Sequence, residues 1–108
     1  MTDLEICKRI AEIEGLNVAA PSEVASREYL ENVCVIIPEG EYHPQSYCYN
    51  PLTDKALCFD LMVKHKLSLI APEGEQEDWD CVIRDVLTVH KSPNRAICLA
   101  IIEAHKNE

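Results

Sequence analysis

Residues 79–102 read WDCVIRDVLTVHKSPNRAICLAII, and this stretch does most to decide the fold class. Two runs of strand composition, residues 79–84 and 86–90, are separated by one residue, so one bent strand or a tight bulged turn would both fit. Ser92 suits a helix N-cap and Pro93 suits the first helical position, which predicts that a helix begins here. The helix is apolar almost all round, as expected if it packs on more than one side.

Helical patterns occur at three earlier places in the chain. From residue 4 to 14 apolar residues recur at helical spacing, with Thr2 placed for a capping box and Gly15 for a C-terminal glycine. Residues 22–31 fit a second, short helix, and residues 55–65 fit a longer one. We expect the apolar face of the longer helix to consist of Ala56, Phe59 and Val63.

Strand patterns lie between these helices. Residues 33–37 are five continuous apolar residues, which predicts a strand central to a sheet, and residues 47–49 are a candidate partner for it. Residues 67–71 also have strand composition. Because strands and helices do not alternate regularly, we expect an α+β fold, an α/β sandwich whose small mixed or antiparallel sheet packs between helices. At 108 residues, the chain is expected to form a single domain, residues 1–108.

The charge of the chain narrows the class of partner. A formal net charge of −9 disfavours binding to nucleic acid or anionic membranes, because clustered Lys and Arg supply that attraction. No signal peptide or membrane-spanning run is seen, so we expect the protein in the cytoplasm with its six cysteines reduced.

The densest local concentration of charge is an acidic segment that follows the strand predicted at residues 67–71. It carries the candidate partner-binding residues Glu73, Glu75, Glu77, Asp78 and Asp80. Clustered carboxylates could also bind a divalent cation, but the order of an EF-hand loop is absent. A solvated loop is the simplest interpretation. A sharper hypothesis adds further acids to form an anionic face toward a basic partner, namely Glu12, Glu14, Glu23, Glu28 and Glu31.

The cysteines lack the close pairs typical of a zinc site, so we predict no metal site and no cofactor. Four of them lie inside apolar runs and are expected to pack in the core: Cys7, Cys34, Cys58 and Cys98. Of the other two, Cys48 is the candidate for chemistry, since nearby His43 could lower the pKa of its thiol and create a reactive pair. No third, orienting residue can be named, and no catalytic residue is predicted.

A larger pattern runs through the second half of the chain. It begins at Tyr49-Asn50-Pro51-Leu52-Thr53-Asp54, resumes near Trp79 and closes with Ser92-Pro93 and residues 96–100. This pattern resembles the phage ABA-sandwich domain family of small phage and prophage proteins. The resemblance implies an α/β sandwich and a phage or prophage gene product in the host cytoplasm. It implies no catalytic residues and no cofactor.

These observations favour a non-enzymatic phage or prophage accessory protein that binds a host or phage protein. One alternative is an acidic inhibitor, a partial nucleic-acid mimic, of a host nucleic-acid-handling or defence protein. Another is a small-molecule or metal-binding protein that uses Cys48, His43 and the acidic segment. A homo-oligomeric structural component is the third.

Overall fold

The structure of the chain is a computed structural model, which describes residues 1–19, 34–38 and 46–106. The expected helix at residues 22–31 lies outside the described residues. The chain divides into two compact units, Met1–Asn50 and Pro51–Glu108, and each is described by itself. The single domain expected from chain length remains a prediction.

Helix α1 (Asp3–Ile13) opens the first unit and has the predicted ends. The Thr2 side chain accepts a hydrogen bond from the Glu5 backbone N–H at 3.2 Å, which satisfies one of the unpaired donors of the first turn. Gly15 has a φ of +71°, the left-handed conformation that glycine adopts without a Cβ penalty. The buried face of α1 consists of Ile6, Cys7, Ile10 and Ala11.

A small antiparallel sheet completes the described part of this unit. It pairs β1 (Val35–Ile36) with β2 (Tyr47–Cys48), as the sequence predicts. On its other side β1 is bridged to Val18, and the Ala19 N–H donates to the Val35 carbonyl at 2.8 Å. Strand β1 therefore has backbone partners at both edges, and its predicted central position is confirmed.

The second unit begins with helix α3 (Lys55–His65), which has the predicted bounds. The Asp54 side chain caps it by accepting from the Leu57 N–H at 3.1 Å. Lys66 ends the helix with a φ of 56° and a ψ of 49°, a left-handed conformation at a residue that is not glycine.

The expected apolar face of α3 is wrong. Phe59 is 58% exposed and Val63 is 60% exposed, whereas Cys58 and Leu61 are buried. The reason is that apolar residues occupy most of the circumference of this helix, so helical spacing cannot select the buried side. Packing against the rest of the unit decides it.

Three antiparallel strands form the sheet of the second unit, in the order β3 (Ser68–Ile70), β4 (Trp79–Ile83) and β5 (Val86–His90). Ile83 pairs with Val86, so the β4–β5 turn has two central residues. The first of these, Arg84, has a φ of 52°. A tight turn, and not one bent strand, therefore connects the two runs, and the uninterrupted register shows that it does not contain the expected bulge.

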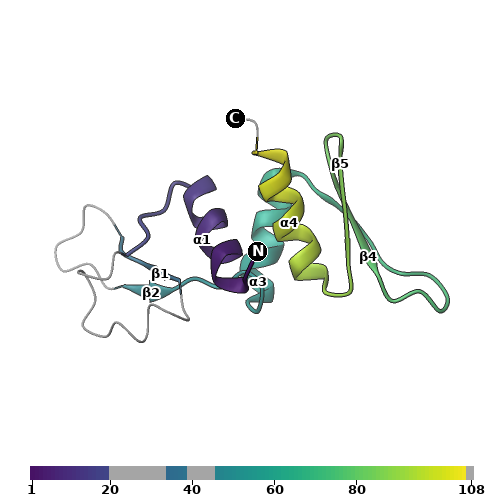
Figure 1. Ribbon diagram of the computed structural model, residues 1–108, viewed down its shortest axis with the longest axis horizontal. Coiled ribbons are helices and arrows are strands. Elements are labelled where there is room, and N and C mark those ends of the chain that lie inside the picture. Colours follow the sequence, from purple (N-terminus) through teal and green to yellow (C-terminus); the bar gives the residue numbers. More distant parts are fainter. Residues whose placement is uncertain (20–33, 39–45, 107–108) are drawn as a thin grey trace. The chain divides into compact units, whose positions relative to one another are not determined.

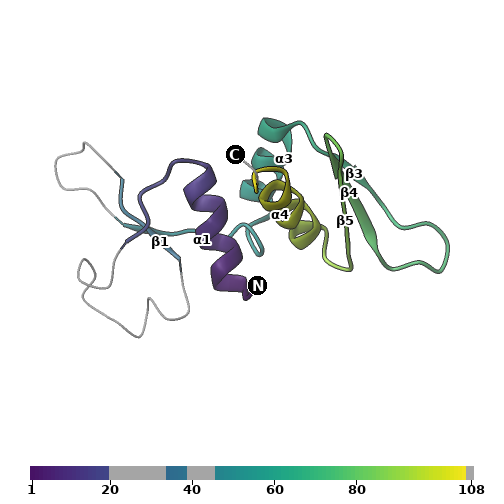
Figure 2. The same ribbon diagram turned by 45° about the horizontal axis from the view of Figure 1, so that its top comes forward.

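Helix α4 (Pro93–Ala104) packs against β4 and β5 on one side and α3 on the other (Figures 1 and 2). The Ser92 side chain caps it, as predicted, by accepting from the Arg95 N–H at 3.3 Å. The Thr88 hydroxyl donates to the Ala96 carbonyl at 2.6 Å and joins the sheet to the helix. The predictions that this helix packs on more than one side and that the fold is α+β are confirmed.

Candidate functional site

The acidic segment connects β3 to β4 and meets solvent along most of its length. Glu73, Glu75, Glu77 and Asp78 are all exposed. Asp80 differs from these four because it lies within β4 and is half-buried. Its register partners are Ile70 in β3 and Val89 in β5, both of which are about half exposed. The segment thus presents four carboxylates outward, and the fifth lies on the open face of the sheet.

An ion pair fixes one point of this segment. The Lys91 ammonium lies 3.6 Å from a Glu77 carboxylate oxygen, and both side chains are about three-quarters exposed. Such a pair contributes little to stability in water. Its position is more informative, because Lys91 directly precedes the N-cap of α4. The pair therefore brings the acidic segment to the start of that helix.

The carboxylates do not gather into a cation site in the described part of the chain. Among residues 1–19, 34–38 and 46–106, no three His, Cys, Asp or Glu side chains lie together in a way that could hold a metal ion. Ca²⁺ takes six to eight oxygen ligands, about twice that minimum. The acids of this segment mostly alternate with uncharged residues, and the carboxylates described here do not meet at one point.

Cys48 lies in β2 and is the one exposed cysteine of the chain. His43 lies outside the described residues, so the proposed Cys48–His43 pair remains a prediction. All six cysteines are thiols, and five are buried. Burial of Cys7, Cys34, Cys58 and Cys98 confirms their predicted place in the core.

Local environment sets the ionisation of three buried thiols. Burial, together with the charge of nearby Cys7, raises the pKa of Cys34 to about 11, and burial likewise raises the pKa of Cys81 to about 11. A hydrogen bond with the Cys98 thiol lowers the pKa of Cys58, against the effect of burial. Two of these thiols are therefore held protonated, as suits core residues, and Cys58 and Cys98 form a local pair.

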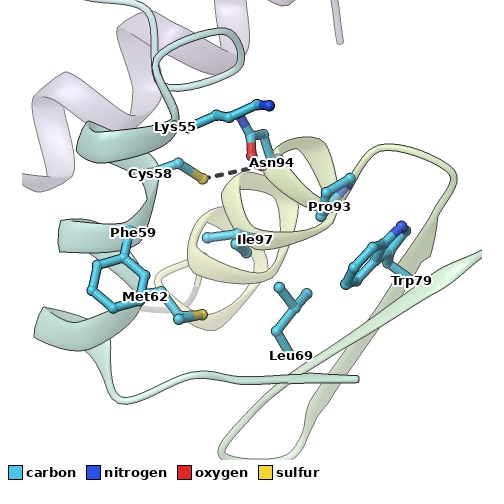
Figure 3. Close-up of a pocket in the computed structure, with 9 residues that line it drawn as sticks. All are labelled: Lys55, Cys58, Phe59, Met62, Leu69, Trp79, Pro93, Asn94 and Ile97. Atoms are coloured by element: carbon cyan, nitrogen blue, oxygen red, sulfur yellow. Dashed lines mark hydrogen bonds between the residues drawn. The ribbon is translucent and has the colours of Figure 1, made fainter. Parts of the chain in front are cut away.

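An apolar pocket that the sequence did not predict lies within the second unit (Figure 3). It has a volume of about 220 Å³ and is lined by two helices and two strands. Phe59 and Met62 come from α3, Leu69 from β3, Trp79 from β4, and Ile97 from α4. In Figure 3 Phe59 and Trp79 lie on opposite sides of Ile97. The pocket therefore has an aromatic side chain on each of two sides.

Hydrogen bonds hold the two helices together beside this pocket. The Cys58 thiol donates to the Asn94 carbonyl at 3.8 Å (Figure 3). The Asn94 side-chain amide donates to the Leu52 carbonyl at 3.1 Å, which ties α4 to the turn before α3. These hydrogen bonds therefore join the two helices that line the pocket. The sequence does contain a sign of the pocket. Helix α3 has more apolar residues than its buried side can hold, so Phe59 stays outside the core.

The sequence of the chain also matches a protein-family model. Residues 1–105 match the family model described as "Bacteriophage P22, NinX". The chain belongs to the bacteriophage P22 NinX family. No curated protein and no solved structure matches the chain.

Membership in the NinX family confirms that the sequence pattern beginning at Tyr49 belongs to a phage protein family. The phage ABA-sandwich name is not confirmed by this match. The residues matched to NinX include both the acidic segment and the pocket. No helix in the described part of the chain is long and apolar enough to span a membrane.

Proposed function

We propose that this NinX-family chain is a phage accessory protein that acts by binding another protein and has no catalytic activity of its own. The observation that carries the proposal is the exposure of Glu73, Glu75, Glu77 and Asp78 on one short segment. Clustered exposed charge raises the rate at which a partner of opposite charge arrives. The partner is a host or phage protein with a basic surface, met in the host cytoplasm.

The test compares two variants of equal net charge. The first neutralises the segment, and the second neutralises four exposed acids elsewhere. The segment variant carries Glu73→Gln, Glu75→Gln, Glu77→Gln and Asp78→Asn. The control variant carries Asp3→Asn, Asp60→Asn, Asp85→Asn and Glu103→Gln. All eight positions are exposed, so neither variant disturbs buried residues.

Tagged wild-type chain and both variants are then used to capture proteins from host lysate, with and without phage infection. We expect a partner that wild type and the control variant retain and the segment variant loses. Equal retention by all three would refute a role for the segment, because the two variants have the same net charge and differ only in where it was reduced.

A finer form of the proposal makes the chain an inhibitor of a host nucleic-acid-handling or defence protein. The four exposed carboxylates would then occupy a groove that normally binds phosphates. In that case the captured partner binds nucleic acid, and added nucleic acid displaces the chain from it. Simultaneous binding of both would reject the mimic.

The exposure of Cys48 supports a second candidate, a small-molecule or metal-binding role that uses Cys48, His43 and the acidic segment. Its test is metal analysis of the purified chain together with thermal-shift measurements in divalent ions and nucleotides. A shift that Cys48→Ser or His43→Ala removes would favour this role. If no metal is found and no shift occurs, the role is excluded. Gel filtration addresses the remaining alternative, a homo-oligomer.

A further inference from the structure

We infer that the apolar pocket and the acidic segment form one docking surface, which binds a partner-protein segment carrying an aromatic side chain beside a Lys or Arg. The inference rests on the proposed protein-binding function and specifies the chemistry of the partner.

The volume of the pocket limits what it can hold. At about 220 Å³ it is smaller than the roughly 300–1,000 Å³ typical of sites for drug-sized ligands and cofactors. A nucleotide would not fit within it. One aromatic ring on a short side chain would, and such anchors in pockets supply much of the binding energy of protein interfaces.

The side chains that line the pocket also favour an aromatic ring. Phe59 and Trp79 offer ring faces and edges, and Met62 offers a polarisable thioether, which makes favourable contacts with aromatic rings. Phe59 lines the pocket and is 58% exposed, so its ring is accessible to an incoming side chain. An aromatic anchor would cover it.

The charge next to the pocket selects the residue beside the anchor. Trp79 lines the pocket and directly follows the acidic segment in the sequence. The Glu77–Lys91 ion pair places the segment beside the start of α4, two residues before Pro93, which also lines the pocket. The Glu77 carboxylate therefore lies near the start of α4, where a Lys or Arg of the partner would meet it.

Among the residues that the structure describes, Lys55 is the cationic side chain that lines the pocket, and it belongs to the first turn of α3. Figure 3 shows it beside Cys58 and Asn94, away from the Trp79 ring. The pocket thus has a cation among its lining side chains, and the acidic segment lies outside the lining. A bound segment would place its own cation away from Lys55 and toward Glu77.

The experiment pans a random peptide display library against the full-length chain. We expect enriched peptides to share one aromatic residue next to a Lys or Arg. Peptides without an aromatic residue, aromatic peptides without a basic residue, or no enrichment at all would each overturn the inference.

An enriched Phe or Tyr peptide is then titrated against the chain. Trp79 is the single tryptophan of the chain, so its fluorescence reports directly on the pocket. Phe59→Ser should weaken binding by about tenfold or more, as expected for loss of a contact to an anchor. Val63→Ser is the matched control, because Val63 is on the same helix and is 60% exposed but does not line the pocket. Equal affinities of the two variants would overturn the inference.

The lysate capture separates this inference from the proposed function. If Phe59→Ser still retains the partner and the segment variant loses it, the docking surface is refuted while the protein-binding function stands. If the partner is retained equally by wild type and both charge variants, the role of the acidic segment in the proposed function is refuted.

Discussion

Glu77 and Lys91 form an ion pair of 3.6 Å that joins the acidic segment to the residue before the N-cap of α4. The pair links two parts of the second unit that differ in role. One is the charged connection between β3 and β4, and the other is the helix whose first residue, Pro93, lines the pocket. The pair therefore shows where the charged connection approaches the helix that lines the pocket.

We predict that this pair contributes little to folding. Both side chains are about three-quarters exposed, so a double-mutant cycle with Glu77→Gln and Lys91→Gln should give a coupling of less than about 0.5 kcal/mol in chemical denaturation. A coupling above about 1.5 kcal/mol would show that the pair is a structural element and not a surface feature.

The backbone of Lys66, at the C-terminus of α3, is predicted to be strained. Lys66 has a φ of 56°, and a left-handed conformation costs a residue with a Cβ roughly 1 kcal/mol. Lys66→Gly should therefore raise the free energy of unfolding by about 0.5–1 kcal/mol. Thermal unfolding measures it. Lys64→Gly, inside the same helix, should instead destabilise by about 1 kcal/mol. Destabilisation by both would contradict the conformation of Lys66.

Thiol labelling tests the burial of the cysteines. In native buffer a thiol reagent should modify Cys48 quickly and the five buried thiols slowly, whereas the denatured chain should expose all six. The Cys48→Ser variant should lose the fast phase altogether. Peptide mapping that found rapid modification of Cys58 or Cys98 would contradict the packing of the second unit.

Alkaline pH should weaken the fold through Cys81 and Cys34. An unfolded thiol ionises with a pKa near the ordinary value of 9.0, whereas burial raises the pKa of each folded thiol to about 11. Because the folded state keeps the proton longer, stability is full below pH 9 and declines from pH 9 to 11. The loss should be on the order of 2 kcal/mol per thiol.

Urea unfolding between about pH 8 and pH 10.5 checks this prediction. Cys81→Ala should flatten part of the decline even though it lowers stability at neutral pH. Cys48→Ala is the control, because the exposed thiol meets solvent before and after unfolding. An identical decline in wild type and Cys81→Ala would rule out this thiol as a cause.

Local signals predicted much of the fold. Ser92 and Pro93 define the start of α4 by the hydrogen bond and the fixed φ that a helix start requires. The helical pattern of residues 55–65 gives the bounds of α3, and the centre of the first sheet follows from the apolar run at Val35 and Ile36. Each of these depends on residues close together in the chain.

The buried side of α3 and the pocket could not be predicted in this way. Phe59 and Leu61 are both large apolar residues, yet Leu61 is buried and Phe59 is 58% exposed, a difference that helical spacing does not contain. The pocket needs Leu69, which follows α3 closely, together with residues of β4 and α4 that are distant from α3 in the sequence. The acidic segment was visible in composition, and the structure adds its link to α4 through Lys91.

The rate at which the captured partner associates, measured against ionic strength, tests the proposed function most directly. For wild type and the control variant we predict a decline of about tenfold from about 50 to 500 mM salt. The segment variant, which lacks the carboxylates of Glu73, Glu75, Glu77 and Asp78, should associate slowly with little dependence on salt. Equal rates for all three proteins at every ionic strength would contradict the proposal that this segment guides the partner to its binding surface.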